Sequence, residues 1–194
     1  MISGNSRRSP KLLLALAAVL LSAPALAAWD VASLMAVLAQ HPTGKVRFTE
    51  TKTLAVLDAP VVSTGELVYA PPDRLEKNTL KPKPESMMVE RDTLVLERDG
   101  RQRKLNLQQY PEVLPIIEAV RGTLCGNQSL LEQYYALEVD GDPQDWRLTL
   151  KPQDKRVQRW IKQITVIGKA GEIARIDTEQ ADGDKSVLRI EPLP

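Results

Sequence analysis

The sequence predicts an α+β protein built on one large antiparallel sheet of about eleven strands. Two observations lead to this class. Short runs of alternating apolar and polar residues recur along most of the chain, whereas apolar residues at helical spacing occur in just three segments after the leader. Because the strands follow one another through short turns without intervening helices, we expect antiparallel pairing of chain neighbours.

The N-terminus has the pattern of a secretory signal peptide. Arg7, Arg8 and Lys11 form a basic segment, Leu12–Leu21 is an unbroken apolar run, and Ala25–Ala27 follows a small-x-small pattern. A transmembrane anchor needs about 20 apolar residues, and this run is shorter. We therefore expect residues 1–27 to be a signal peptide, cleaved after about Ala27.

The remaining residues, 28–194, are enough for one domain with a hydrophobic core. The leader carries three of the positive charges, so its removal changes the formal charge from +1 to −2. Lysine and arginine are spread evenly, which argues against nucleic-acid binding. Cys125 is the single cysteine, so no intramolecular disulfide can form, and we expect a buried thiol.

The first helix is expected from Val31 over about three turns, with Asp30 as its cap and a stop before Gly44. Strands follow, and the Asp99-Gly100 pair predicts a tight hairpin between the last two of them. The first set of expected strands lies at residues 45–54, 63–70, 73–82, 85–91, 93–99 and 101–107.

The pattern changes at Tyr110, where apolar residues at helical spacing predict a helix within 110–124 and a shorter one within 127–135. Strands then return to the end of the chain. This second set is expected at residues 135–142, 145–152, 159–168, 172–180 and 185–191.

The predicted sheet is too large for its predicted helices. Strand twist accumulates, so some eleven strands must curl strongly or split. Three helices of modest length cover only part of such a concave face. Either the sheet closes around a packed interior, or it leaves a hollow beneath the helices.

Groups that could perform catalysis or bind metal are scarce. His41 is the single histidine and lies next to Pro42, where a turn residue is expected. The sequence has no phosphate-binding glycine loop and no nucleophile elbow. The segments 139–143 and 181–185 lack the order of a calcium loop and are interpreted as hairpin turns. We therefore predict no catalytic residue, no metal site and no cofactor.

Five stretches of the chain together match the pattern of a known family: "VRFTE" (46–50), "STGELVYAPPDRLEK" (63–77), "KPKPE" (81–85), "VERDTLVLERDG" (89–100) and "WRLTLKPQD" (146–154). With these stretches, the chain resembles the LolA family of outer-membrane lipoprotein carriers. The resemblance extends over almost all of the chain after the leader. It implies an incomplete, half-open antiparallel β-barrel of eleven strands with helices forming a lid, and a hydrophobic cavity for acyl chains.

Apolar residues of the expected helices and strands are the candidates for lining the cavity and its lid. They are Leu34, Leu38, Phe48, Leu67, Tyr69, Leu75, Met87, Val89, Leu94, Leu96, Leu114, Ile117, Val120, Trp146, Leu148 and Leu150. For each of them, an ordinary place in the core is the alternative.

One position departs from the family pattern. LolA carriers usually have an arginine directly before the proline of the second strand, and that arginine bonds the lid backbone and holds the empty carrier closed. Here the position is Pro71, which has no such donor. Arg74 is the candidate for a substitute lid contact.

The resulting hypothesis is a monomeric periplasmic carrier of an acylated lipid or lipoprotein. It would receive cargo from an inner-membrane exporter and pass it to an outer-membrane acceptor. Two alternatives remain open: a protein-binding module of the cell envelope, and a lipid-processing enzyme.

Overall fold

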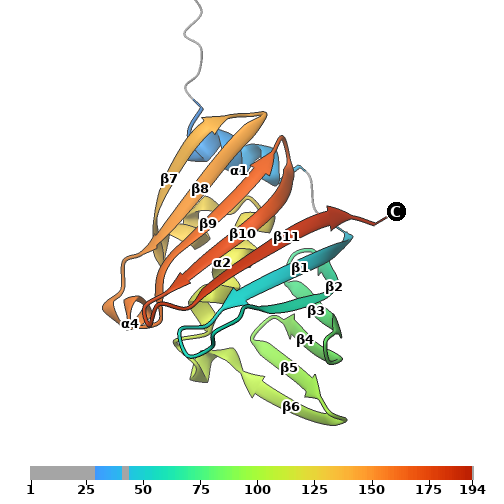
Figure 1. Ribbon diagram of the computed structural model, residues 1–194. Coiled ribbons are helices and arrows are strands. Elements are labelled where there is room, and N and C mark those ends of the chain that lie inside the picture. Colours follow the sequence, from blue (N-terminus) through green and yellow to red (C-terminus); the bar gives the residue numbers. More distant parts are fainter. Residues whose placement is uncertain (1–28, 41–43, 194) are drawn as a thin grey trace, which may run out of the picture.

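The computed structural model describes residues 29–40 and 44–193, which form one eleven-stranded antiparallel sheet with a few helices (Figure 1). The expected signal peptide and His41 lie outside the described residues. The strands are β1 (Lys45–Thr53), β2 (Val61–Ala70), β3 (Arg74–Lys81), β4 (Glu85–Glu90), β5 (Thr93–Arg98), β6 (Arg101–Asn106), β7 (Tyr135–Asp142), β8 (Asp145–Pro152), β9 (Ile161–Lys169), β10 (Glu172–Gln180) and β11 (Lys185–Pro192).

The sheet consists of two meanders joined at its centre. Its order is β6-β5-β4-β3-β2-β1-β11-β10-β9-β8-β7, so β1 lies between β2 and the last strand of the chain. The two outermost strands, β6 and β7, are not paired with each other, and the sheet stays open. This confirms the predicted α+β class and the incomplete antiparallel barrel.

The helical segments are α1 (Val31–Leu38), the 3₁₀ turn η1 (Leu107–Gln109), α2 (Leu114–Leu124), α3 (Gln128–Glu132) and α4 (Lys155–Gln158). Three of them, η1, α2 and α3, lie where the chain passes from one edge of the sheet to the other, whereas α1 precedes β1 and α4 lies between β8 and β9. Because β6 and β7 are opposite edges, the connection through η1, α2 and α3 must span the sheet. Figure 1 shows the sheet curving around α2, with α1 close to β7 and β8.

Local sequence signals account for most element ends. Asp30 caps α1, since its carboxylate accepts a hydrogen bond from the Ser33 backbone N–H at 2.8 Å. Pro115 lies in the first turn of α2, where its missing N–H costs nothing. In the β5–β6 hairpin, Asp99 (φ 52°) and Gly100 (φ 70°) both have positive φ, as a type I′ turn requires. The Asp30 cap and the Asp99-Gly100 hairpin match the expectations from the sequence.

The end of α2 depends on Gly126. Its φ of +61° is accessible to glycine at little cost, and a Cβ there would collide with the backbone carbonyl of Met35. This close approach brings the end of α2 against α1. The short helix α4, in contrast, was not expected from the sequence; Asp154 caps it by accepting from the Arg156 N–H at 2.7 Å.

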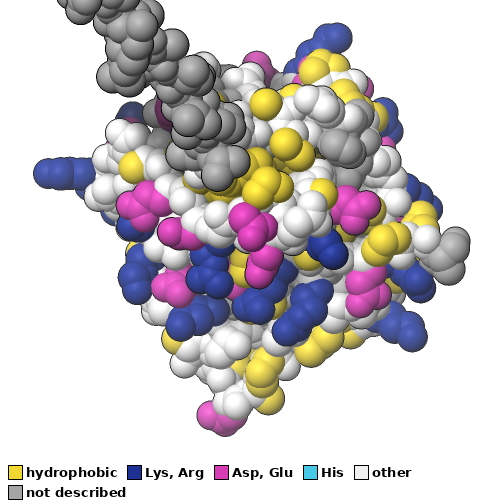
Figure 2. Space-filling model, turned by 90° about the horizontal axis from the view of Figure 1, so that it is seen from above, with side chains coloured by type: hydrophobic (Ala, Val, Ile, Leu, Met, Phe, Trp, Pro, Cys, Tyr) yellow, Lys and Arg dark blue, Asp and Glu magenta, His cyan; other side chains and the backbone are white. Residues whose placement is uncertain are grey.

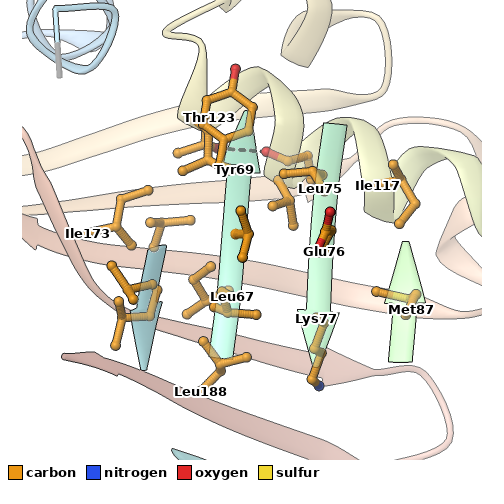
Figure 3. A pocket seen from close by; sticks show the side chains of 18 of the residues that line it. Leu67, Tyr69, Leu75, Glu76, Lys77, Met87, Ile117, Thr123, Ile173 and Leu188 are labelled. Atoms are coloured by element: carbon orange, nitrogen blue, oxygen red, sulfur yellow. Dashed lines mark hydrogen bonds between the residues drawn. The ribbon is translucent and has the colours of Figure 1, made fainter. Parts of the chain in front are cut away.

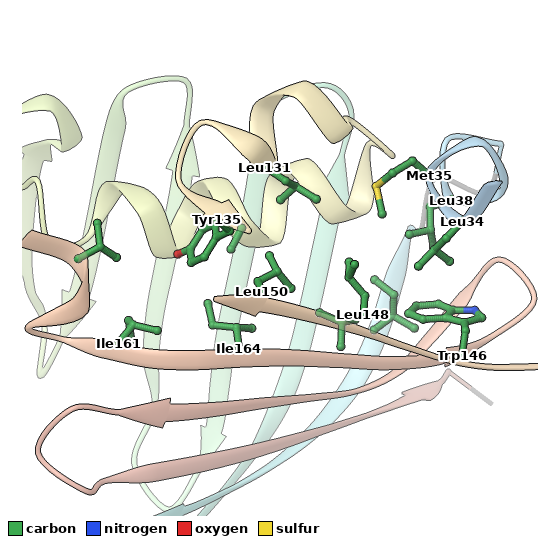
Figure 4. Close-up of a cluster of buried hydrophobic side chains, with 14 residues drawn as sticks. Leu34, Met35, Leu38, Leu131, Tyr135, Trp146, Leu148, Leu150, Ile161 and Ile164 are labelled. Atoms are coloured by element: carbon green, nitrogen blue, oxygen red, sulfur yellow. The ribbon is translucent and has the colours of Figure 1, made fainter. Parts of the chain in front are cut away.

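The larger of two hydrophobic cores fills the space between α1, α3 and strands β7 to β10 (Figure 4). Trp146 is its largest fully buried side chain, and its indole N–H donates to the Ala170 carbonyl at 2.8 Å. Tyr135 is equally buried and donates its hydroxyl to the Pro115 carbonyl at 2.9 Å, which ties β7 to α2. This core therefore fixes the helices to the part of the sheet formed by β7 to β10, which we call one wing.

The smaller core lies in the other wing, which is formed by β3 to β6. Val89, Leu94 and Leu107 are buried there, and Ile117 of α2 packs onto them. Helix α2 thus contacts hydrophobic cores on both sides of the molecule. Between the two cores it crosses the concave face of the sheet.

Charged side chains of both signs are interspersed on the face seen in Figure 2. Most ion pairs of the described residues are exposed, such as Lys151–Glu138 at 2.7 Å. Pairs of this kind contribute at most about 1 kcal/mol each. The stability of the fold must therefore come mainly from the two apolar cores.

We predict that Leu148→Ala lowers the free energy of unfolding by about 3 kcal/mol, because it leaves a cavity in the larger core. Leu148 is fully buried. Leu80→Ala is the matched control, since Leu80 is 57% exposed and should change stability by less than about 0.5 kcal/mol. Urea denaturation followed by circular dichroism measures both, and equal losses would contradict the assignment of this core.

Candidate functional site: an apolar cavity under helix α2

A cavity of about 170 Å³ lies between α2 and the concave face of the sheet (Figure 3). Strands from both wings form its floor, and α2 forms its roof. It is lined by Gly44, Val46, Leu67, Val68, Tyr69, Leu75, Glu76, Lys77, Met87, Ile117, Ala119, Val120, Thr123, Leu124, Ile164, Val166, Ile173, Ile176, Leu188 and Ile190. Because most of these side chains are aliphatic, the cavity suits an apolar ligand.

The floor follows from strand periodicity. Alternate residues of a strand point to the same face of the sheet, and Leu67 and Tyr69 of β2 are such a pair. In β11, Leu188 and Ile190 have the same spacing. Figure 3 shows Tyr69 and Thr123 at one end of the cavity and Leu188 and Lys77 towards the other.

Six of the sixteen residues predicted for the cavity and lid line it. They are Leu67, Tyr69, Leu75, Met87, Ile117 and Val120. The prolines at the β2–β3 connection occupy a turn, so Tyr69 and Leu75 face each other directly across two neighbouring strands.

Ten of the sixteen do not line the cavity. Leu34, Leu38, Trp146, Leu148 and Leu150 belong to the larger core. Val89, Leu94, Leu96 and Leu114 belong to or pack on the smaller core. Phe48 is buried beneath the Lys77 ammonium, whose nitrogen lies 5.0 Å from the ring centroid. These ten residues therefore have the alternative role that the sequence left open, an ordinary place in the core.

Several lining residues were not among the sixteen. Ile164 and Val166 of β9, Ile176 of β10 and Leu188 and Ile190 of β11 come from the second meander. Their alternation was visible in the sequence. What was missing was the pairing of β11 with β1, which brings the last three strands under the same helix as β2 and β3.

A buried ion pair ends the apolar part of the floor. The Lys77 ammonium donates to the Glu50 carboxylate at 2.5 Å, and the Ser186 hydroxyl donates to the other carboxylate oxygen at 2.7 Å. Glu50 is 6% exposed. Burial alone would raise the pKa of Glu50, but Lys77 and Ser186 together hold this pKa below its ordinary value. Beyond this pair the concave face is lined by both charged and apolar side chains.

Arg121 fastens α2 to the rim of the sheet. Its guanidinium donates to the carbonyl of Asp73 at 3.3 Å, in the β2–β3 turn, and to that of Arg91 at 2.9 Å, in the β4–β5 turn. A third bond, at 2.6 Å, goes to Glu118 one turn earlier in α2. Arg121 is 8% exposed, and its Nε has no partner within the described part of the chain.

Arg74 does not make the lid contact for which it was the candidate. Its guanidinium pairs with Glu76 at 2.6 Å and approaches Glu90 at 3.8 Å. The reason is strand alternation, because Leu75 points into the cavity and its neighbour Arg74 points to the other face. The expectation placed the arginine on the sheet and the carbonyls on the lid. Here the arginine is on α2, and the carbonyls that it binds are in the β2–β3 and β4–β5 turns at the rim of the sheet.

Tyr69 and Cys125 meet at the end of the cavity. The Tyr69 hydroxyl lies 2.7 Å from the Cys125 sulfur, and the Cys125 thiol lies 3.5 Å from the Pro72 carbonyl. Burial and the contact with Cys125 raise the pKa of the Tyr69 hydroxyl. Cys125 is partly exposed rather than buried, which corrects the expectation for this residue.

In the part of the chain that the structure describes, no cluster of histidine, cysteine and acidic side chains has the geometry of a metal site. None of the helices described is both long and apolar enough to cross a membrane.

Comparison with solved structures gives matches at low sequence identity. A LolA superfamily protein from Nitrosomonas europaea is 12% identical, with a TM-score of 0.44 over 86% of this chain and 96% of the other. The lipoprotein LppX of Mycobacterium tuberculosis is 11% identical, with a TM-score of 0.43 over 84% of this chain and 97% of the other. The Pseudomonas aeruginosa MucA/MucB complex gives 13% identity and 0.43 over 84% of this chain and 58% of the matched one.

A search of curated protein sequences finds no match. A family model described as "Outer membrane lipoprotein carrier protein LolA-like" matches residues 23–189. Since this match covers most of the chain, including every strand up to the middle of β11, the protein belongs to the LolA-like family.

Proposed function

We propose that the protein is a periplasmic carrier that holds the acyl portion of a lipid or lipoprotein in the cavity under α2. It would take this cargo from an inner-membrane exporter and deliver it to an outer-membrane acceptor, as a monomer and without a catalytic step. Membership of the LolA-like family and the leader pattern of residues 1–27 support this role.

The observation that carries the proposal is the aliphatic lining of the cavity. Each methylene moved from water into such surroundings contributes about 0.8 kcal/mol. Some ten methylenes would therefore contribute about 8 kcal/mol without any specific polar contact. An acyl chain needs no other recognition to be held there.

The size of the cavity implies that α2 moves when a long chain enters. Its volume of about 170 Å³ is close to the ~150 Å³ of an engineered protein cavity that holds benzene. A long acyl chain is much larger than benzene. The described structure is thus the closed state, and loading requires α2 to rise from the floor.

Arg121 is the natural restraint on that movement. Opening breaks its two bonds to the rim carbonyls, while the bond to Glu118 stays within α2. A hydrogen bond that involves a charged group such as a guanidinium contributes about 1.5–3 kcal/mol net. The Nε of Arg121 is buried without a hydrogen-bond partner among the described residues, and this cost offsets part of the stabilisation from the two bonds. The closed state is therefore held by a modest free energy that cargo binding can exceed.

We predict that Leu188→Trp weakens binding of the apolar dye N-phenyl-1-naphthylamine by ten-fold or more, on the order of 1.4 kcal/mol, because the indole would occupy much of the cavity. Val187→Trp is the matched control, since the neighbouring residue points to the opposite face. Fluorescence titration measures the affinity. Native mass spectrometry of protein expressed in a periplasm should show bound lipid for the control.

The same experiment separates the proposed role from its alternatives. A chain that binds neither dye nor any acyl compound, in wild type and control alike, would contradict the carrier role and favour a protein-binding module. Conversion of the bound lipid into a product would instead indicate an enzyme.

We predict that Arg121→Lys speeds dye entry about ten-fold, because a lysine cannot hold two separate carbonyls and Glu118 in the fixed fork of a guanidinium. Stopped-flow fluorescence measures the rate. Hydrogen exchange of residues 114–124 should rise in parallel.

Arg74→Lys serves as the control for Arg121, since Arg74 is at the rim but bonds to Glu76. Its entry rate should equal that of wild type. If Arg74→Lys speeds dye entry and Arg121→Lys does not, the restraint on α2 belongs to Arg74.

A further inference from the structure

The concave face continues beyond the Glu50–Lys77 pair into a second, open groove of about 790 Å³. We call it the arginine groove, after Arg98, Arg101 and Arg103, which line it together with Lys52 and Lys77. It is formed by the ends of β3 to β6 and of β1. Unlike the cavity under α2, it is lined by both charged and apolar side chains.

The arginine groove and the apolar cavity are adjacent. Lys77 and Met87 line both of them. A single molecule with an apolar tail in the cavity could therefore extend past Lys77 and place a polar end in the groove. The Lys77 ammonium lies at the boundary, where such a molecule would change from apolar to polar.

The register of β5 and β6 concentrates positive charge at this place. Arg101 pairs with Arg98 directly across the strands, and Arg103 pairs with Leu96. Like charges directly opposite each other destabilise a sheet. The arrangement thus carries a cost in the free protein, which a bound anion would remove.

The acidic residues nearby compensate only part of this charge. Glu85, Glu97 and Asp99 also line the groove. Arg98 lies 3.8 Å from Glu85 and 3.9 Å from Asp99. Arg101 and Arg103, by contrast, have no carboxylate within 4.0 Å among the residues that the structure describes, so two guanidinium groups face the groove without counter-charge.

We propose that the arginine groove binds the anionic headgroup, a phosphate or carboxylate, of the lipid whose acyl portion occupies the cavity. This inference rests on the proposed carrier function and deepens it by naming the class of cargo. A guanidinium donates two parallel hydrogen bonds to a phosphate or carboxylate, which matches the chemistry of such a headgroup. Because the groove is open to water, the headgroup stays partly hydrated, and the added affinity is moderate and sensitive to salt.

The test compares two lipids that share a tail and differ in headgroup charge. The probes are 1-myristoyl-lysophosphatidylglycerol, which is anionic, and 1-monomyristoylglycerol, which is neutral and has no phosphate, each below its critical aggregation concentration. Displacement of N-phenyl-1-naphthylamine from the cavity reports their affinities. For the wild-type protein we expect the anionic lipid to bind about ten-fold more tightly at low salt, and the preference to shrink at 0.5 M NaCl.

The double variant Arg101→Gln/Arg103→Gln should lose this preference and keep the affinity for the neutral lipid. Lys104→Gln is the matched control, because it removes a positive charge from the same strand at a position that points to the opposite face. The control should retain the wild-type preference. Thermal unfolding should show that all variants remain folded, since the substituted side chains are exposed.

Two results would overturn the headgroup site alone: equal displacement by both lipids in the wild type, or a preference that persists in the double variant. In both cases the lipids still displace the dye, so the acyl cavity stands. Failure of both lipids to displace the dye would overturn the carrier function itself. If glycerol phosphate alone binds Arg101 and Arg103 while the lipids show no preference, the groove is a site for free anions and the proposal is wrong.

Discussion

The pairing of β1 with β11 is the constraint on which the rest of the structure depends. It joins the first strand of the chain to the last over eight residues, from Val46–Pro192 to Thr53–Lys185. Without it, the two meanders would be separate sheets, each with a small core. With it, they form one curved surface, and the chain between them has to cross that surface. The cavity exists because the crossing segment is a helix that rests on the two wings and not on the floor between them.

The strands and their order within each meander could be predicted from the sequence, because alternation and turn residues are local signals. The Asp99-Gly100 hairpin and the Asp30 cap are such cases, since each depends on a few neighbouring residues. Helix α4 was missed because four residues within a connection give no periodic signal, although Asp154 provides a cap. The family resemblance supplied what the local pattern left open, which was that the sheet does not close.

The site was predicted less completely, for a physical reason. Leu67 and Leu148 have the same alternating pattern, yet one lines the cavity and the other is in the core. The difference lies in which helix covers them, and this is a property of the whole fold. Arg121 was missed for the same reason, since its carbonyl partners are 48 and 30 residues away in sequence. The pattern around Pro71 correctly indicated that a lid arginine is absent from β2, but it could not show that one is present in α2.

The route of the crossing segment has a mechanical consequence. Helix α2 is tethered at both ends, through η1 to the edge strand β6 and through α3 to the opposite edge strand β7. The helix therefore spans the concave face and is attached on both sides, unlike a flap that is hinged on one side. To rise, it must either draw the two wings closer together or lengthen its own connections. Unless the connections lengthen, sheet curvature and access to the cavity are therefore coupled. Under the proposed carrier function, a contact that bends either edge strand would act on a bound acyl chain at a distance.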